Sequence, residues 1–175
     1  MTGEGFRRGV RLGVDVGAVR VGLAVCDRDG LIASPVETLR RDAKRLTDVD
    51  RVVAEVAERE AVEVVVGLPT SLSGARGAAA QAALDYALTL ARRLAPVPVR
   101  LVDERLSTVS AHRALHDAGL RGRRHRSVID QVAAVMILQT ALDAEHASGR
   151  PPGSLVDPGP GPDGPDGAKE ETPLA

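Results

Sequence analysis

The sequence predicts an α/β domain with a central mixed five-stranded sheet and helices on both faces. Two observations support this fold class. Short runs rich in β-branched residues alternate with stretches of helical periodicity, in the order βββαβαβαα. In addition, each strand–helix–strand passage implies a crossover connection, which leaves its helix on a face of the sheet.

The first three predicted strands, residues 10–17, 20–27 and 31–39, follow one another without a helix and therefore predict an antiparallel meander. The stretch Asp27–Gly30 has the composition of a hairpin turn. Pro35 lacks a backbone N–H, so it indicates an edge position or a bulge in the third strand.

The later elements alternate between helix and strand. They are helix 42–60, strand 62–69, helix 77–95, strand 97–105, helix 107–119 and helix 127–147. The strand at 62–69 is a continuous apolar run, which is typical of a strand covered on both faces.

Composition divides the chain into three parts. Residues 1–9 are expected to be a flexible N-terminus, residues 10–147 one folded domain, and residues 148–175 a disordered acidic tail holding 7 of the 11 prolines and 6 of the 18 glycines. The single cysteine, Cys26, excludes an intramolecular disulfide. No stretch reads as a membrane span or signal peptide, so we expect a cytoplasmic protein.

Asp15 is a carboxylate inside an otherwise apolar strand. Period-two alternation puts Gly13, Asp15 and Gly17 on one face of that strand. The missing side chains at the two glycines predict room for a metal ion or a phosphate beside the carboxylate. Pairing of Asp15 with an arginine remains the alternative.

Two further groups of acids are candidates. Asp103 and Glu104 end a predicted strand and point to opposite faces of it. In open α/β sheets ligands bind at such strand ends. Solvation of the two carboxylates, or their pairing with Arg105, is the alternative explanation for their presence. Asp130 stands three residues after Ser127, a spacing that suits a helix N-terminus. The apolar sequence after Asp130 indicates instead that this acid faces the sheet.

Taken together, Asp15, Glu104 and Asp130 could converge on one point. Carboxylate oxygens are the ligands that Mg²⁺ prefers, and Mn²⁺ accepts them as well. A pair of such ions can stabilise the attacking and leaving oxygens of a phosphodiester displacement. The three acids therefore predict a divalent-metal site of a phosphodiesterase.

Four spaced motifs, GVDVGAVRVGLA, VVVGLP, VDERLST and DQVAAVMILQ, resemble those of the bacterial pre-16S rRNA nuclease or Holliday junction resolvase family. The resemblance covers residues 10–146 and implies an RNase H-like fold. It implies that Asp15, Glu104 and Asp130 are the metal-binding catalytic acids. Residues near the site, by the same resemblance, are Arg20, Arg105 and Thr108.

The chain departs from the family pattern at two places. Ser107 stands where threonine is usual, and the loop TSLSGARG lacks the commoner acid before its glycine. Neither departure touches the three acids, but loops of this kind tend to contact substrate.

The basic run from Arg121 to Arg126 is predicted to lie in a loop between the last two helices. Arg121, Arg123 and Arg124 could contact a nucleic-acid backbone there, or the run could be a solvated charge cluster. Near-absent aromatic residues, 1% of the chain, argue against base-stacking platforms.

The sequence as a whole therefore favours a metal-dependent nuclease that processes the 5′ end of pre-16S rRNA. A resolvase of branched DNA and a non-catalytic RNA- or ribosome-binding module remain alternatives. An actin-like ATPase or sugar kinase would need two such domains, for which 175 residues are too few. The expected partners are structured RNA or branched DNA and a pre-ribosomal particle, with the protein a monomer or weak homodimer.

Overall fold

A computed structural model describes residues 5–70, 77–104 and 123–160. Its strands are β1 (Arg11–Val16), β2 (Arg20–Cys26), β3 (Ala33–Arg40), β4 (Glu63–Leu68), β5 (Val99–Asp103) and β6 (Ser154–Leu155). Its helices are α1 (Thr47–Glu58), α2 (Ala78–Leu94) and α4 (Arg123–Ser148). The strands form one sheet in the order β3-β2-β1-β4-β5-β6.

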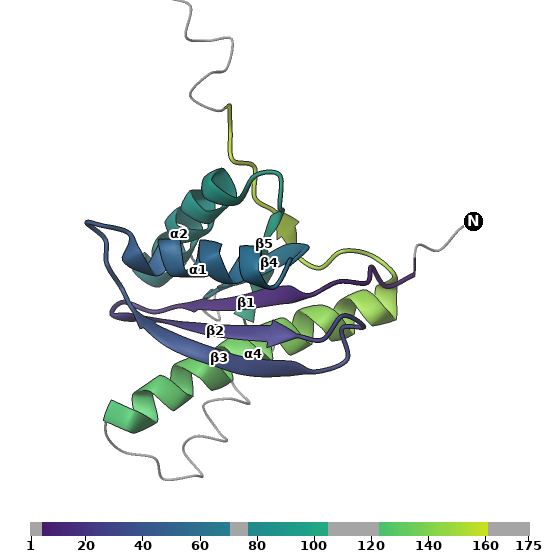
Figure 1. Cartoon of the computed structure of the whole chain (residues 1–175), viewed down its shortest axis with the longest axis horizontal. Helices are drawn as coiled ribbons and strands as arrows, with labels where there is room; N and C mark the ends of the chain where they lie inside the picture. Colours follow the sequence, from purple (N-terminus) through teal and green to yellow (C-terminus); the bar gives the residue numbers. More distant parts are fainter. Residues whose placement is uncertain (1–4, 71–76, 105–122, 161–175) are drawn as a thin grey trace, which may run out of the picture.

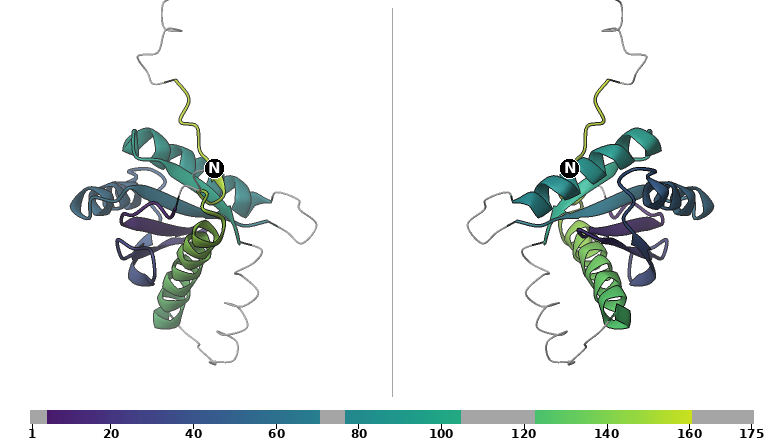
Figure 2. Two further views of the ribbon diagram at one scale, coloured as in Figure 1. Left: turned by 90° about the vertical axis from the view of Figure 1, so that its right-hand side faces the viewer. Right: turned by 90° about the vertical axis from the view of Figure 1, so that its left-hand side faces the viewer.

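The sheet is mixed and covered on both faces, as the sequence predicts. Strands β1, β4 and β5 run parallel, whereas β2, β3 and β6 are antiparallel to their neighbours. Helix α4 packs on one face and α1 and α2 on the other, and the end-on views show these three layers (Figure 1, Figure 2). No helix in the described ranges is both long and apolar enough to cross a membrane.

The alternation along β1 divides the core between the two faces. Leu12 and Val14 are fully buried in the cluster formed with α1 and α2. Gly13 and Asp15 face α4, where small residues of the sheet meet Ala134 and Leu138. Small residues on this face let the helix approach the sheet closely, which determines the geometry of the candidate site.

The sheet has six strands, so the prediction of five is wrong. Residues of the predicted tail form β6, whose Ser154 and Leu155 pair with Leu101 and Arg100 of β5. Backbone hydrogen bonding along an open strand edge holds this segment, and composition alone does not reveal such a bond. The boundary of a disordered tail at Ser148 is therefore too early, and residues 161–175 lie outside the described residues.

The meander and its edge agree with the prediction. β3 is the edge strand, and its register against β2 shifts between Leu23 and Ala24, opposite Pro35. The last helix begins earlier than expected, at Arg123, so Ser127 lies inside it and is not its cap. The predicted helix 107–119 falls outside the described residues.

The first residues of the described chain are held in place, in contrast to the predicted flexible N-terminus. The Phe6 ring stacks on His146 at a centroid distance of 3.9 Å. The Arg7 guanidinium binds Glu63 and Glu145, which are almost fully buried. These acids come from β4 and from the end of α4, so the anchoring depends on long-range pairs that local sequence does not show.

Candidate active site

Asp15 and Glu104 meet at the edge of the sheet where β1, β4 and β5 end. Asp15 faces α4 from β1, and Glu104 follows the last residue of β5. Strand β4 lies between them, and Gly67 occupies the crossing point: a Cβ there would lie 2.2 Å from Glu104 Oε1. The missing side chain at Gly67 lets Glu104 reach over β4 and hydrogen-bond Asp15.

The two carboxyl groups hold protons more tightly than free acids do. Burial, followed by the charge of Asp130, raises the pKa of Asp15 to about 6. Burial, the Asp15 charge and the hydrogen bond to Asp15 raise the pKa of Glu104 to about 7. Because Glu104 has the higher pKa, it donates to Asp15 while the pair holds one proton.

Asp130 lies near this pair and forms an ion pair with Arg20. The Arg20 Nε donates to Asp130 Oδ2 at 2.7 Å. Gly22, which pairs with Asp15 across β1 and β2, brings α4 close: a Cβ at Gly22 would lie 2.1 Å from the Asp130 carbonyl oxygen. The three predicted acids therefore lie in one neighbourhood, with Arg20 as the cation among them.

The glycines that flank Asp15 along its own strand do not leave the free space that the sequence predicted. A Cβ at Gly13 would meet Leu138 Cβ at 2.7 Å, and one at Gly17 would meet the Arg20 carbonyl at 2.8 Å. Helix α4 and the β1–β2 turn fill these positions. Gly22 and Gly67, on the neighbouring strands, are the glycines that shape the site.

The donor set consists of carboxylates, which suits a hard divalent cation. Within the described ranges, no group of three acidic, histidine or cysteine side chains is already arranged to hold a metal ion. In this arrangement the Asp130 Oδ2 atom accepts from Arg20.

The remaining predicted site residues are placed only in part. Arg105, Thr108 and Arg121 lie outside the described residues. Arg123 and Arg124 lie in the first turn of α4 and not in a loop, which corrects the prediction for the basic run; only their backbone is described.

Comparison with known proteins identifies the family. The family model described as RuvX, Holliday junction resolvase, matches residues 9–144. The chain belongs to this family. The family that the sequence motifs resemble is therefore confirmed.

Curated relatives in the RuvX family carry the name "Putative pre-16S rRNA nuclease". The relative from Kineococcus radiotolerans is 60% identical over 151 residues, which cover 86% of this chain and 80% of that protein. The relative from Thermobifida fusca is 57% identical over 159 residues, covering 87% and 98%. The relative from Streptomyces coelicolor is 52% identical over 160 residues, covering 89% and 92%.

A solved structure supports the fold. The RuvC protein of T. thermophilus, in complex with a Holliday junction substrate, superposes with a TM-score of 0.51 at 18% identity, covering 82% of this chain and 99% of that one. At this identity the similarity concerns the fold, which is the RNase H-like arrangement that the motifs imply.

One cluster that supports the candidate site could not be predicted from the sequence. Arg41 donates from its backbone N–H to the Val19 carbonyl at 2.8 Å and from Nη1 to the Gly17 carbonyl at 3.0 Å. Its guanidinium also lies 3.7 Å from buried Asp48 and over the Tyr86 ring. Arg41 thereby fixes the β1–β2 turn between Asp15 and Arg20. An acid at helical spacing among apolar residues, Asp48, is the signal that could have indicated a buried partner.

Asp103 belongs to a different environment from Glu104. Its Oδ1 accepts a hydrogen bond from Thr70 Oγ1 at 3.0 Å. Leu101, two residues earlier, packs with the α1–α2 cluster, whereas Val102 packs with α4. The alternation predicted for this strand end, with Asp103 and Glu104 on opposite faces, is therefore consistent with the packing.

Proposed function

We propose that this protein is a divalent-metal-dependent nuclease that hydrolyses phosphodiester bonds, with pre-16S rRNA as its substrate and its 5′ end as the site of processing. The observation that carries the proposal is the Asp15–Glu104 pair, held together across Gly67 with raised pKa values and with Asp130 beside it. Structural proteins have little use for two half-buried carboxyl groups in contact, whereas hydrolytic sites need them.

The residues present fit a Mg²⁺ or Mn²⁺ ion. Burial is the main cause of the raised pKa values, with the Asp130 charge adding to that of Asp15 and the Asp15 charge adding to that of Glu104, and a bound cation would offset the cost of ionising both groups. Asp15, Glu104 and Asp130 would hold the metal. When bound, the metal supplies Lewis acidity to activate water and to stabilise the leaving 3′ oxygen.

The protein's own groups have separate tasks in this proposal. Asp15 and Glu104 would lose their shared proton on holding a metal and would present oxygens from the strand ends. Asp130 would turn from Arg20 to the cation, which would leave the guanidinium available to a substrate phosphate. The other proposed substrate-binding residues are Arg105, Thr108, Arg121, Arg123 and Arg124.

The names of the relatives support pre-16S rRNA as the substrate. We further propose a pre-ribosomal particle as the setting and the cytoplasm as the compartment. The family description and the RuvC complex favour a second candidate, cleavage of a four-way DNA junction. We propose a monomer or weak homodimer. A non-catalytic RNA-binding module is the reading that the experiment must exclude.

The test is cleavage of a 5′-extended 16S rRNA fragment and of a four-way DNA junction with Mg²⁺ or Mn²⁺. Wild-type protein should cut the RNA, and Asp15→Asn should reduce cleavage by at least about a thousandfold while RNA binding persists. Asp143→Asn, an exposed acid on the same helix as Asp130, is the control and should cut normally. Cleavage that survives Asp15→Asn would overturn the proposed site. RNA binding by the wild-type protein without any cleavage would indicate the non-catalytic RNA-binding module.

A further inference from the structure

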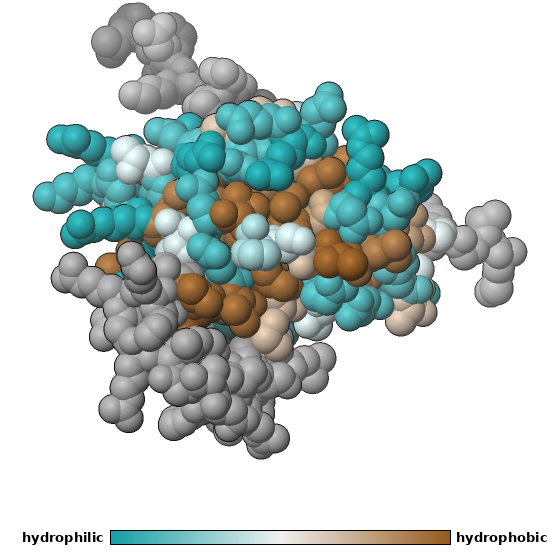
Figure 3. All heavy atoms as spheres, turned by 60° about the horizontal axis from the view of Figure 1, so that its bottom comes forward, coloured by the Kyte–Doolittle hydropathy of each residue, from teal (hydrophilic) through white to brown (hydrophobic). Residues whose placement is uncertain are grey.

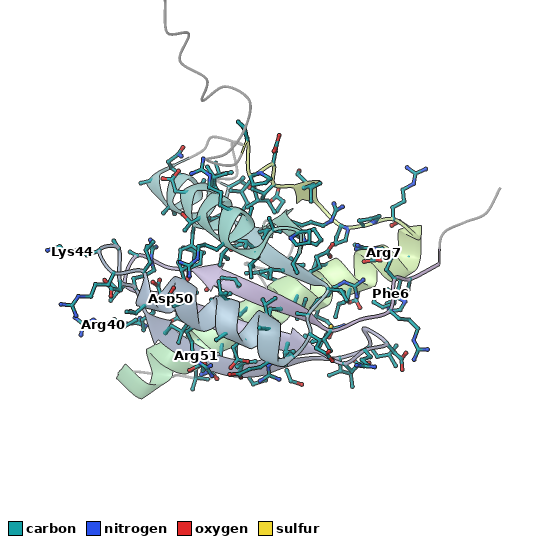
Figure 4. The ribbon with its side chains drawn as sticks, turned by 45° about the horizontal axis from the view of Figure 1, so that its top comes forward. Phe6, Arg7, Arg40, Lys44, Asp50 and Arg51 are labelled. Atoms are coloured by element: carbon teal, nitrogen blue, oxygen red, sulfur yellow. The ribbon has the colours of Figure 1, made fainter. Side chains whose placement is uncertain are left out.

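A corner of the molecule next to the site carries three exposed cations. Arg40 ends β3, and Lys44 and Arg45 lie in the connection to α1; all three are exposed. We call these three residues the basic corner. Arg40 and Lys44 project outward at the end of the molecule opposite Phe6 and Arg7 (Figure 4).

The cations of the basic corner stand close together in the sequence, whereas the other exposed arginines of the described residues are more scattered. Arg8 pairs with Asp29 and Arg93 with Asp50, and Arg92 donates to the Pro158 carbonyl. Among the residues that the structure describes, no acid lies within 4.0 Å of the side-chain nitrogens of Arg40, Lys44 or Arg45, although the Arg45 backbone N–H and the Arg45 charge help to lower the pKa of Asp42. Hydrophilic side chains protrude at this end of the molecule (Figure 3). Unpaired cations that gather at one place favour a partner that brings negative charge.

The sheet register puts the basic corner on the side of the candidate site. Arg20 pairs with Arg40 across β2 and β3, so both share the face on which Arg20 meets Asp130. Gly22, two residues further along β2, pairs with Asp15. From strand spacing, the Cα atoms of Arg40 and Asp15 are about 12 Å apart, roughly the reach of a nucleic-acid strand over two nucleotides.

The corner is also held in a fixed shape. The Asp42 carboxylate accepts from the backbone N–H groups of Lys44 and Arg45, at 3.2 and 2.9 Å, and from Thr47 Oγ1 at 2.9 Å. Arg41, next in sequence to Arg40, is bonded to the β1–β2 turn. A preorganised set of cations loses little entropy when it meets a polyanion.

We propose that the basic corner binds the phosphate backbone of the substrate nucleic acid on one side of the cleavage point. This inference rests on the proposed nuclease function and extends it by assigning the path of the substrate from Asp15 over the end of β3. Because phosphate contacts carry no sequence information, the corner contributes affinity and register and not base specificity.

The test is the salt dependence of binding, measured by fluorescence anisotropy in an Asp15→Asn background without metal. The probes are an RNA hairpin with a 5′ extension and a four-way DNA junction. The variant Arg40→Gln/Lys44→Gln/Arg45→Gln should lower the slope of log K against log salt by about 2 and weaken binding at low salt about tenfold or more. Arg40→Lys/Arg45→Lys should keep the slope.

The matched control is Arg28→Gln/Arg92→Gln/Arg150→Gln, which removes the same charge at exposed positions away from the corner. Its slope should stay close to that of the parent protein. An equal loss in both triple variants would overturn the proposal, because general charge would then explain binding. An unchanged slope in the basic-corner variant would overturn it as well.

Cleavage assays separate the two proposals. In these assays the same variants keep the wild-type aspartate at position 15. If wild-type protein cuts RNA but the corner variant keeps the parental salt slope, the corner is refuted and the nuclease stands. If the corner variant loses slope while wild-type protein cuts neither probe, the corner is confirmed as a nucleic-acid contact, but the nuclease and the assignment of the corner to a cleavage substrate are both refuted.

Discussion

Glu104 hydrogen-bonds Asp15 across an intervening strand, at the one position where that strand carries a glycine, Gly67. The contact joins β1 to β5 over β4, so it depends on the sheet order and not on sequence proximity. It places two acids in contact at the strand ends. The proton that they share and the space over Gly67 are the two features that can be tested without knowing the substrate.

The first prediction concerns stability without metal. Both pKa values lie above those of free carboxyl groups, so the pair stabilises the fold fully below about pH 4 and loses this contribution as pH rises through 6 to 7. Asp15→Asn removes an ionisable group of the pair, so the variant does not lose this stabilisation as pH rises. Urea denaturation with EDTA should show the variant more stable than wild type at pH 8, on the order of 2 kcal/mol.

At pH 4 to 5 the advantage of Asp15→Asn should shrink or vanish, because the wild-type pair is then protonated. Asp143→Asn is the control, since its carboxylate is exposed. The free energy of unfolding could instead fall by the same amount in the wild type and in Asp15→Asn between pH 5 and pH 8. That result would contradict a proton shared by the pair.

The second prediction concerns Gly67→Ala. The new methyl group would occupy the place of Glu104 Oε1 and approach Ile137 Cδ1 to 2.5 Å, and both are ends of flexible side chains. The fold should therefore survive at a cost of about 1 to 2 kcal/mol, while Glu104 is displaced from Asp15. Nuclease activity and the pH dependence described above should both fall.

Gly22→Ala makes a useful comparison with Gly67→Ala. Its methyl group would meet the Asp130 backbone carbonyl, which cannot move unless α4 moves. We expect Gly22→Ala to destabilise the protein more than Gly67→Ala in thermal denaturation. The reverse order would show that the approach of α4 to β2 is looser than the structure has it.

The third prediction concerns Arg20, whose guanidinium hydrogen-bonds the Asp130 carboxylate in the structure. Arg20→Gln removes the competing cation, so Mn²⁺ should bind several-fold more tightly in calorimetric titration. RNA cleavage should nevertheless fall, since the guanidinium is proposed to contact substrate. Weaker Mn²⁺ binding by Arg20→Gln would mean that Arg20 positions Asp130 for the metal and does not compete with it.

The fourth prediction concerns the ion cluster at the far end of the sheet. Glu63 is fully buried and accepts from Arg7 and Arg100, with Arg11 3.4 Å away. Glu63→Gln leaves Arg11, only 1% exposed, short of negative charge. We expect a loss of about 3 to 5 kcal/mol in urea denaturation.

Glu60→Gln is the control for Glu63→Gln, because Glu60 is an exposed neighbour in sequence whose side chain is 84% accessible. It should change stability by less than about 0.5 kcal/mol. Similar values for the two variants would show that the cluster does not stabilise the fold.

The sequence predicts the order of the elements from β1 to β5 and the position of the edge strand, because period-two alternation and Pro35 are local signals. It misses β6, whose Ser154 and Leu155 bind through backbone groups to the open edge of β5. It also misses the anchoring of Arg7, because Glu63 and Glu145 are distant in sequence. Long-range electrostatics and edge pairing leave no local pattern.

For the site, alternation puts Asp15 on the glycine face of its strand and separates Asp103 from Glu104, and the family motifs mark Asp15, Glu104 and Asp130 as one set. The sequence could not show why they meet. The decisive glycines, Gly22 and Gly67, belong to neighbouring strands, so their role depends on register and strand order. The partner of Asp130, Arg20, was expected at the site as a substrate residue, but its ion pair with that acid follows only from the packing of α4 on β2.

The most direct test of the central claim is the position of Mn²⁺ in a crystal of the wild-type protein, located by its anomalous scattering. We expect a peak bound by Asp15, Glu104 and Asp130, with the Arg20 guanidinium moved off Asp130. No peak at Asp15 and Glu104 at saturating Mn²⁺, or a peak elsewhere with the Arg20–Asp130 pair intact, would contradict it.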